Sequence, residues 1–174
     1  MEKYRITEIK DKGNYKVTYI WHPGTIPKNV PVQQVYGFCS TKDNLVALVR
    51  EKDDTRFTPP GGGVEKGETA LEALHREFLE EVQFAPENVK LLGSLEVFNP
   101  GAEEEIQKHN LQVRFVCSID SVGDFVPLKD GETEERIFVN YNELPEYVGF
   151  IKKYTSGKMQ YDMYCDYIEG KLVL

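Results

Sequence analysis

Three glutamates in one short segment are the residues of this chain that point most directly to chemistry. Glu77, Glu80 and Glu81 lie in the stretch ALEALHREFLEEVQF, which begins at Ala70. Spacings of three and four residues put side chains on one side of a helix, so the three carboxylates are expected to be neighbours. A bound divalent cation would turn their repulsion into ligation, and Mg²⁺ takes carboxylate oxygens together with water and substrate phosphates.

The same stretch has the apolar pattern of a helix that packs on a core. Its apolar residues recur at intervals of three and four: Leu71, Leu74, Phe78 and Val82. This periodicity predicts a helix over residues 70–84 with one buried face. A charged helix with one apolar face can also be a plain solvated surface with no site, so the surrounding residues must decide.

A glycine turn precedes the helix and completes the pattern. Gly61, Gly62 and Gly63 follow two prolines. Glycines let the backbone approach a ligand closely. Five residues separate Gly62 from Glu68, and seven more lead to Arg76 beside the first of the three glutamates.

This arrangement resembles the Nudix box, whose pattern is G-x5-E-x7-R-E-U-x-E-E-x-G-U with U apolar. The chain matches the pattern from Gly62 through Glu81 and again at Phe84, but Gln83 replaces the late glycine. That glycine usually lets the chain turn tightly out of the helix, so the substitution puts the helix exit in question and leaves the ligands in place. Over roughly residues 32–154 the chain looks like a Nudix (MutT-like) hydrolase.

The resemblance implies roles for the box residues. Four groups would hold the metal, which is expected to be Mg²⁺ with Mn²⁺ as an alternative: the Gly62 carbonyl and the carboxylates of Glu77, Glu80 and Glu81. Glu68 and Arg76 would brace the glycine turn and the helix, as residues behind metal ligands generally do. An ordinary helix ion pair between Arg76 and Glu80 is the plainer interpretation.

An acidic loop beginning at Asp130 offers a further carboxylate, as loops in this position often do in the family. The candidates are Glu132, Glu134 and Glu135, with Glu134 ranked slightly ahead. A solvated acidic loop is the alternative. The general base therefore stays unassigned between Glu77 and this loop. Two arginines, Arg50 and Arg56, are the candidate substrate-binding residues.

Apolar and β-branched runs around the box predict a sheet. Two hairpins are expected, one from residues 4–9 and 15–20 and one from residues 32–40 and 44–51. Later strands are expected at residues 89–98, with a bulge at Gly93, at residues 111–122 and at residues 136–139. A second helix over residues 143–154 should pack on the sheet. With the family resemblance, the fold class is α/β: an α/β/α sandwich with a mixed sheet between helices.

The expected organisation has three parts. Residues 1–31 form an N-terminal β-hairpin extension and connector, and residues 32–154 form the Nudix hydrolase domain. Residues 155–174 form a strand-like extension that packs on the domain or on a dimer partner. The hairpin either extends the sheet or exchanges with a second subunit, so a homodimer is left open.

Composition excludes several classes of protein. A chain of 174 residues with 40% hydrophobic residues is globular and suits one domain. No apolar run approaches the roughly 20 residues that span a bilayer, and the charged N-terminus lacks a secretion signal, so no membrane partner and a cytoplasmic location are expected. The net charge of −8 argues against extended nucleic acid as a partner. The three cysteines are widely spaced and expected to be reduced.

The predicted reaction is metal-dependent hydrolysis of a phosphoanhydride bond in a nucleoside diphosphate linked to another moiety. The expected substrate is a small nucleotide of the nucleoside triphosphate, ADP-ribose or nucleotide sugar type. Because the protein is acidic, metal would have to offset its repulsion of the substrate. Two alternatives are a non-catalytic Nudix-fold module that binds a nucleotide or a partner, and an interaction protein whose acidic helix is only surface.

Overall fold

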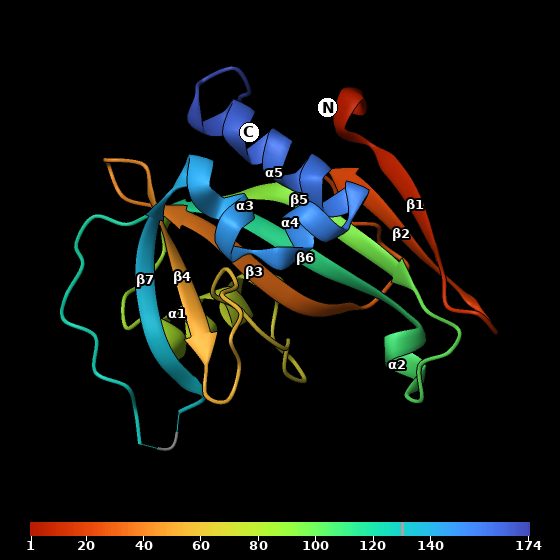
Figure 1. Cartoon of the computed structure of the whole chain (residues 1–174), viewed down its shortest axis with the longest axis horizontal. Coiled ribbons are helices and arrows are strands. Elements are labelled where there is room, and N and C mark those ends of the chain that lie inside the picture. Colours follow the sequence, from red (N-terminus) through yellow and green to blue (C-terminus); the bar gives the residue numbers. More distant parts are fainter. Residues whose placement is uncertain (130) are drawn as a thin grey trace.

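Seven strands form one mixed sheet in a computed structural model that describes residues 1–129 and 131–174. Asp130, the first residue of the predicted acidic loop, lies outside the described residues. The strand order is β1-β2-β5-β6-β3-β4-β7 (Figure 1). Strands β3 and β6 run parallel, and the other neighbouring pairs run antiparallel.

The bounds of the elements agree with most of the predicted segments. The strands are β1 (Ile6–Asp11), β2 (Lys16–Pro23), β3 (Val32–Ser40), β4 (Leu45–Glu51), β5 (Glu87–Phe98), β6 (His109–Ser118) and β7 (Thr133–Asn140). The helices are α1 (Ala70–Glu81), α2 (Glu105–Lys108), α3 (Leu144–Tyr147), α4 (Gly149–Lys153) and α5 (Thr155–Ile168). Short 3-10 turns occur at η1 (Glu2–Tyr4) and η2 (Tyr141–Glu143).

Helices cover both faces of the sheet, with α1 on one face and α3, α4 and α5 on the other (Figure 1). Successive strand residues point to opposite faces, so each strand contributes to two cores. In β4, Val46 and Leu48 belong to the core under α5, whereas Ala47 and Val49 belong to the core under α1. The predicted α/β/α sandwich is confirmed.

Helix α1 starts at a well-formed cap. The Thr69 hydroxyl accepts a hydrogen bond from the Glu72 backbone N–H, and the Glu72 carboxylate accepts one from the Thr69 N–H. This reciprocal pair satisfies two backbone donors at the helix start. The buried face differs in one place from the predicted one, because Leu71 is 46% exposed and Ala73 is buried instead.

Gln83 makes the tight exit that the box glycine usually makes. Its φ is +61°, in the left-handed region, and its backbone N–H donates to the Phe78 carbonyl. The Gln83 side chain donates to the Val126 carbonyl (2.6 Å) and accepts from the Val126 N–H (3.2 Å). The substitution therefore keeps the turn and adds an anchor for the loop that leads to β7.

The N-terminal hairpin extends the sheet within the same chain. Strand β2 pairs with β5, so that Trp21 lies opposite Leu95, and the Trp21 side chain is fully buried. Glu8 on β1 accepts hydrogen bonds from the backbone N–H and the hydroxyl of Ser156, both at 2.9 Å, at the start of α5. Residues 1–31 therefore share a core with the predicted domain.

The C-terminal segment is a helix, so the strand-like extension expected there is wrong. The buried side chains of α5 include Ser156, Gln160, Met163 and Tyr164, which recur at helical intervals of three and four. The expected second helix is also interrupted: Val148 has an extended conformation (φ −99°, ψ 94°) and separates α3 from α4. Two short helices, α3 and α4, and the longer α5 therefore cover this face of the sheet.

Two smaller expectations concern Gly93 and the cysteines. The predicted bulge at Gly93 is confirmed by a register shift between Leu91 and Gly93. Cys39 and Cys117 are direct partners across β3 and β6 with their sulfur atoms in contact, and the reduced state of the three cysteines stays a prediction. None of the described helices is long and apolar enough to cross a membrane.

Candidate functional site

The three box glutamates line one cavity of about 680 Å³. Glu77, Glu80 and Glu81 come from the last turns of α1. The facing residues come from the loop before β7 and from its first residue: Leu128, Lys129, Gly131, Glu132 and Thr133. The Thr133 hydroxyl is buried and has no hydrogen-bond partner among the described residues. The cavity therefore joins segments about fifty residues apart in the chain.

The glycine turn lies directly against these glutamates. The Gly61 N–H donates to Oε2 of Glu81 at 2.7 Å. Gly61 has a φ of +143°, and a Cβ there would lie 2.1 Å from the Val35 carbonyl oxygen. A Cβ on Gly62 would lie 2.5 Å from Oε1 of Glu77. Only glycine fits at position 61, where the backbone of β3 leaves no space, whereas a Cβ at position 62 would displace the Glu77 carboxylate.

Arg76 braces the turn and the helix with its whole guanidinium. It binds both carboxylate oxygens of Glu68, at 2.8 and 3.0 Å, and donates to the Gly63 carbonyl at 2.8 Å. It also donates to Glu77 at 2.9 Å and to Glu80 at 3.3 Å. These contacts support the bracing role over the isolated helix ion pair. The Arg76 guanidinium lowers the pKa of Glu68.

Burial disfavours the ionised forms of two of the glutamates. Desolvation is the main cause that raises the pKa of Glu81 to about 8, and the nearby charges of Glu77, Glu51 and Glu132 raise it further. The hydrogen bond from Gly61 acts in the opposite direction. Burial also raises the pKa of Glu77, although Arg76 opposes this shift. A cation in the cavity would stabilise the charged form of both groups.

The donor chemistry fits a divalent cation, although the side chains do not yet converge. No cluster of three or more His, Cys, Asp or Glu residues forms a ready metal site within residues 1–129 and 131–174. Glu77 and Glu80 face Arg76, and Glu81 faces Gly61. The Glu80 side chain is 58% exposed. Carboxylate oxygens around one cavity are the donors that hard divalent cations prefer.

The Gly62 carbonyl, the fourth predicted metal ligand, already has one partner. It accepts a hydrogen bond from the Val35 N–H at 2.9 Å. A carbonyl oxygen has two lone pairs, so one remains for a second partner. The Glu77 carboxylate packs against this residue, since a Cβ on Gly62 would lie 2.5 Å from Oε1 of Glu77.

The acidic residues near β7 divide between the cavity and a separate ion-pair cluster. Glu132 lines the cavity. Glu134, the preferred candidate from the sequence, instead binds Nη1 of Arg50 at 2.6 Å, and Glu135 binds Nη2 of the same arginine at 2.9 Å. Arg56 pairs with Asp54 at 2.6 Å. The structure thus brings Glu132 to the box glutamates, whereas Arg50, Arg56 and Glu134 contact partners outside the cavity lining.

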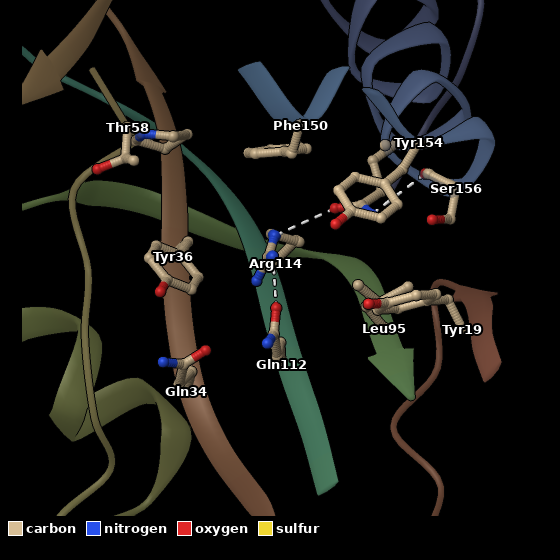
Figure 2. Close-up of a pocket in the computed structure, with 13 residues that line it drawn as sticks. Tyr19, Gln34, Tyr36, Thr58, Leu95, Gln112, Arg114, Phe150, Tyr154 and Ser156 are labelled. Carbon is tan, nitrogen blue, oxygen red and sulfur yellow. Dashed lines mark hydrogen bonds between the residues drawn. The ribbon is translucent and has the colours of Figure 1, made fainter. Parts of the chain in front are cut away.

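A second cavity, of about 250 Å³, lies on the opposite face of the sheet, between the strands and α4 and α5 (Figure 2). Its lining includes Tyr36, Gln112, Arg114, Phe150 and Gln160. The sequence analysis missed this cavity because it expected a strand where α5 covers the sheet. The signal was the alternation in β6, which puts Gln112 and Arg114 on the face opposite Val113 and Phe115.

Comparisons with known proteins agree with the box and the fold. The family model of the NUDIX domain matches residues 31–157. An ADP-ribose pyrophosphatase of Methanocaldococcus jannaschii is 32% identical over 124 residues, which cover 67% of this chain and 69% of that protein. An RNA pyrophosphohydrolase of Halorhodospira halophila is 44% identical over 52 residues, which cover 30% of this chain and 29% of that protein.

A solved structure shares the overall fold. The Bacillus subtilis pyrophosphohydrolase BsRppH has a TM-score of 0.71 at 22% identity. The match covers 93% of this chain and 97% of that chain. The shared fold therefore includes nearly the whole chain.

Proposed function

Because the chain belongs to the Nudix hydrolase family, we propose that it hydrolyses a phosphoanhydride bond in a nucleoside diphosphate linked to another moiety. The observation that carries this proposal is the meeting of Glu77, Glu80 and Glu81 with the glycine turn at one cavity. The names of the two similar proteins, an ADP-ribose pyrophosphatase and an RNA pyrophosphohydrolase, support the same bond type.

The chain's own residues would divide the work of the reaction. Glu77, Glu80, Glu81 and the Gly62 carbonyl would hold the ion. A bound Mg²⁺ or Mn²⁺ would neutralise phosphate oxygens and lower the pKa of a coordinated water. Arg76 would keep Glu77 oriented through the contacts described above. Glu132 replaces Glu134 as the loop carboxylate best placed to accept a proton from the attacking water, and Glu77 is the other candidate.

The substrate is proposed to be small. The net charge of −8 gives no general attraction for a polyphosphate backbone. The relative with similarity over most of its length is named for ADP-ribose, whereas the similarity to the RNA pyrophosphohydrolase covers less than a third of each chain. We therefore place ADP-ribose, nucleotide sugars and nucleoside triphosphates ahead of RNA ends.

The test is turnover of purified protein against a panel of these compounds, with dinucleoside polyphosphates and 5′-triphosphorylated RNA added. Each assay is run with EDTA, with Mg²⁺ and with Mn²⁺, beside Glu81→Gln and the control Glu103→Gln, which changes an exposed acid in the loop before α2. We expect metal-dependent turnover that falls about a hundredfold in Glu81→Gln and stays unchanged in the control.

The contrary result is equally specific. If no compound is turned over, yet one binds equally well to the wild-type protein and to Glu81→Gln, the hydrolase proposal fails. The chain would then be a Nudix-fold module that binds a nucleotide without hydrolysing it.

A further inference from the structure

Arg114 is the buried charge that the proposed reaction does not use. It lies on β6 with its side chain in the cavity on the α5 face, and the residue is only 5% exposed. Figure 2 shows the guanidinium among the labelled side chains, with Tyr36 beside it and Phe150 above it. A charged side chain this deeply buried is rare unless a partner compensates the charge.

The partners of Arg114 in the structure are all neutral. Its Nε donates to the Gln160 side-chain carbonyl at 3.1 Å, its Nη2 to that of Gln112 at 3.0 Å, and its Nη1 to the Val113 backbone carbonyl at 3.4 Å. A guanidinium has five N–H donors, so these three bonds leave two. Among the described residues, no carboxylate forms a salt bridge with it, and Glu8, bonded to Ser156 on the same wall, is paired with Lys10.

Aromatic rings compensate the charge only in part. The guanidinium carbon lies 4.4 Å from the centre of the Tyr36 ring and 5.8 Å from that of Phe150. Such contacts favour a cation, but by less than an ion pair does. Burial lowers the pKa of Arg114 to about 10, so the side chain is still charged at neutral pH. The cavity therefore holds a positive charge with two free donors.

This cavity lies close to the metal-binding candidates. Burial raises the pKa of Tyr36; Arg114 lowers that pKa, whereas Glu81 and Glu77 raise it. The glycine turn also packs on Tyr36, because a Cβ on Gly61 would lie 2.7 Å from the Tyr36 Cα. Thr58 and Pro59, which lead into that turn, line the cavity. A ligand at Arg114 would thus lie behind the turn that holds Glu81.

We propose that the Arg114 cavity is an anion site that binds a phosphate group through the two free N–H donors of the guanidinium. The planar fork of a guanidinium matches two phosphate oxygens, and the surrounding aromatic rings and amide side chains would contact the rest of the ligand. The phosphate could come from the substrate itself, at a position distant from the reacting bond, or from a separate small phosphorylated compound. Both sources share the chemistry that Arg114 recognises.

The first experiment titrates inorganic phosphate into the wild-type protein in EDTA at constant ionic strength. EDTA removes divalent cations, so phosphate cannot bind at the acidic cavity through a metal. We expect phosphate to raise the melting temperature more than chloride does, and to shift the NMR signal of the Arg114 Nε–H. An Arg114 signal that does not move up to high phosphate concentrations overturns the proposal without any variant.

The second experiment compares Arg114→Met with Arg5→Met, an arginine with an exposed side chain whose loss changes the net charge equally. We expect phosphate binding at least tenfold weaker in Arg114→Met and unchanged in Arg5→Met. Equal phosphate responses in the two variants would show that Arg114 is structural. If Arg114→Met does not fold, Arg114→Lys keeps the charge and removes the fork, and the same weakening is expected.

The source of the phosphate follows from kinetics with the compound that the enzyme turns over. A tenfold rise in KM with kcat nearly unchanged in Arg114→Met assigns the site to the substrate. A KM that is unchanged in Arg114→Met assigns the Arg114 site to a separate phosphorylated ligand. Glu81→Gln separates this inference from the proposed function, because it should lose turnover and keep the phosphate response. Loss of that response in Glu81→Gln would contradict a site independent of the metal.

Discussion

Glu81 is a carboxylate whose ionised form destabilises the protein when no metal is bound. Its pKa is raised from 4.5 to about 8, mainly by desolvation. Between these pH values the folded state holds a proton that the unfolded state releases, so stability falls as pH rises from about 4.5 to 8. We therefore expect Glu81→Gln to be more stable than wild type above pH 8 in EDTA, and equally stable near pH 4.

Thermal unfolding across this pH range is the measurement, and a gain of several degrees above pH 8 is the expected size. Addition of Mg²⁺ should raise the wild-type melting temperature and reduce the advantage of the variant, because the ion compensates the charge of Glu81. Stability curves that run parallel at all pH values would mean that Glu81 is not strained by ionisation.

Arg76 should not be replaceable by lysine. Arg76→Lys keeps the positive charge but cannot bind both oxygens of Glu68 and the Gly63 carbonyl at once. We expect kcat/KM to fall about 10- to 100-fold, since residues behind metal ligands have effects of that size. The control is Arg5→Lys, and full activity in Arg76→Lys would leave only the helix ion pair as its role.

The sequence predicted that the three box glutamates are neighbours, because their positions on one helix follow from spacing alone. It could not choose among Glu132, Glu134 and Glu135, since that choice depends on where β7 begins to pair with β4. In the structure Glu135 pairs with Arg50, and the register shifts at Glu134, so that both carboxylates contact the arginine. Arg114 was missed for a similar reason. Helix α5 covers it in the structure, whereas the sequence was expected to form a strand there.

At the scale of elements, the contact of Glu8 with α5 joins the two ends of the chain. Burial alone would raise the pKa of Glu8, but hydrogen bonds from Lys10 and Ser156 lower it to about 2. Since its folded pKa is depressed, its contribution to stability is present above about pH 4.5 and is lost as pH falls towards 2. The contact acts as a helix cap supplied by a distant strand.

We expect Glu8→Ala to cost about 1–2 kcal/mol at pH 7, the usual cost of losing a helix cap. The control is Glu2→Ala, which removes an exposed acid. Chemical denaturation at pH 7 and near pH 2 is the measurement. A difference between wild type and Glu8→Ala that is as large near pH 2 as at pH 7 would argue against a charged cap.

Gln83 should matter more for the loop than for the helix. Gln83→Gly removes the strain of a positive φ but also removes both hydrogen bonds to Val126. We expect the melting temperature to change little and proteolysis within residues 119–132 to become faster. The matched control is Asn88→Gly, which has the same kind of φ but bonds Ser118 at the end of β6.

Equal proteolysis of the two variants would show that Gln83 does not anchor the loop. The same residue shows why the helix exit could not be judged from sequence. The pattern identified a missing glycine. It could not show that the Gln83 side chain forms hydrogen bonds with the backbone carbonyl and N–H of Val126, more than forty positions away. By contrast, α5 was misread locally, because its many aromatic residues favour a strand while their helical spacing is less obvious.

For the whole molecule, we expect the N-terminal and C-terminal segments to fold together with the domain between them. Tyr4, Val17 and Trp21 lie in one core cluster with Phe38 of β3 and Tyr164 of α5. We expect removal of residues 1–31 to abolish cooperative unfolding, because it exposes that core and leaves α5 without Glu8. Circular dichroism melting of the truncated chain is the measurement.

A truncated chain that melts cooperatively near the wild-type temperature would show that the rest of the chain folds without residues 1–31. The sandwich itself was predictable, since strand periodicity and the box fix its layers. The shared core was not predictable, because it depends on the pairing of β2 with β5. Residues of these strands that pair, such as Thr18 and Phe98, are far apart in the sequence.

This pairing order has a consequence for the nascent chain on the ribosome. The hairpin of β1 and β2 emerges first but has no neighbour until β5 is made, and β3 must wait for its parallel partner β6. Ser156, which binds Glu8, is made much later than the hairpin. Contacts so distant in sequence form slowly. The early strands are therefore left with unpaired edges during synthesis, when chaperones or aggregation compete with folding.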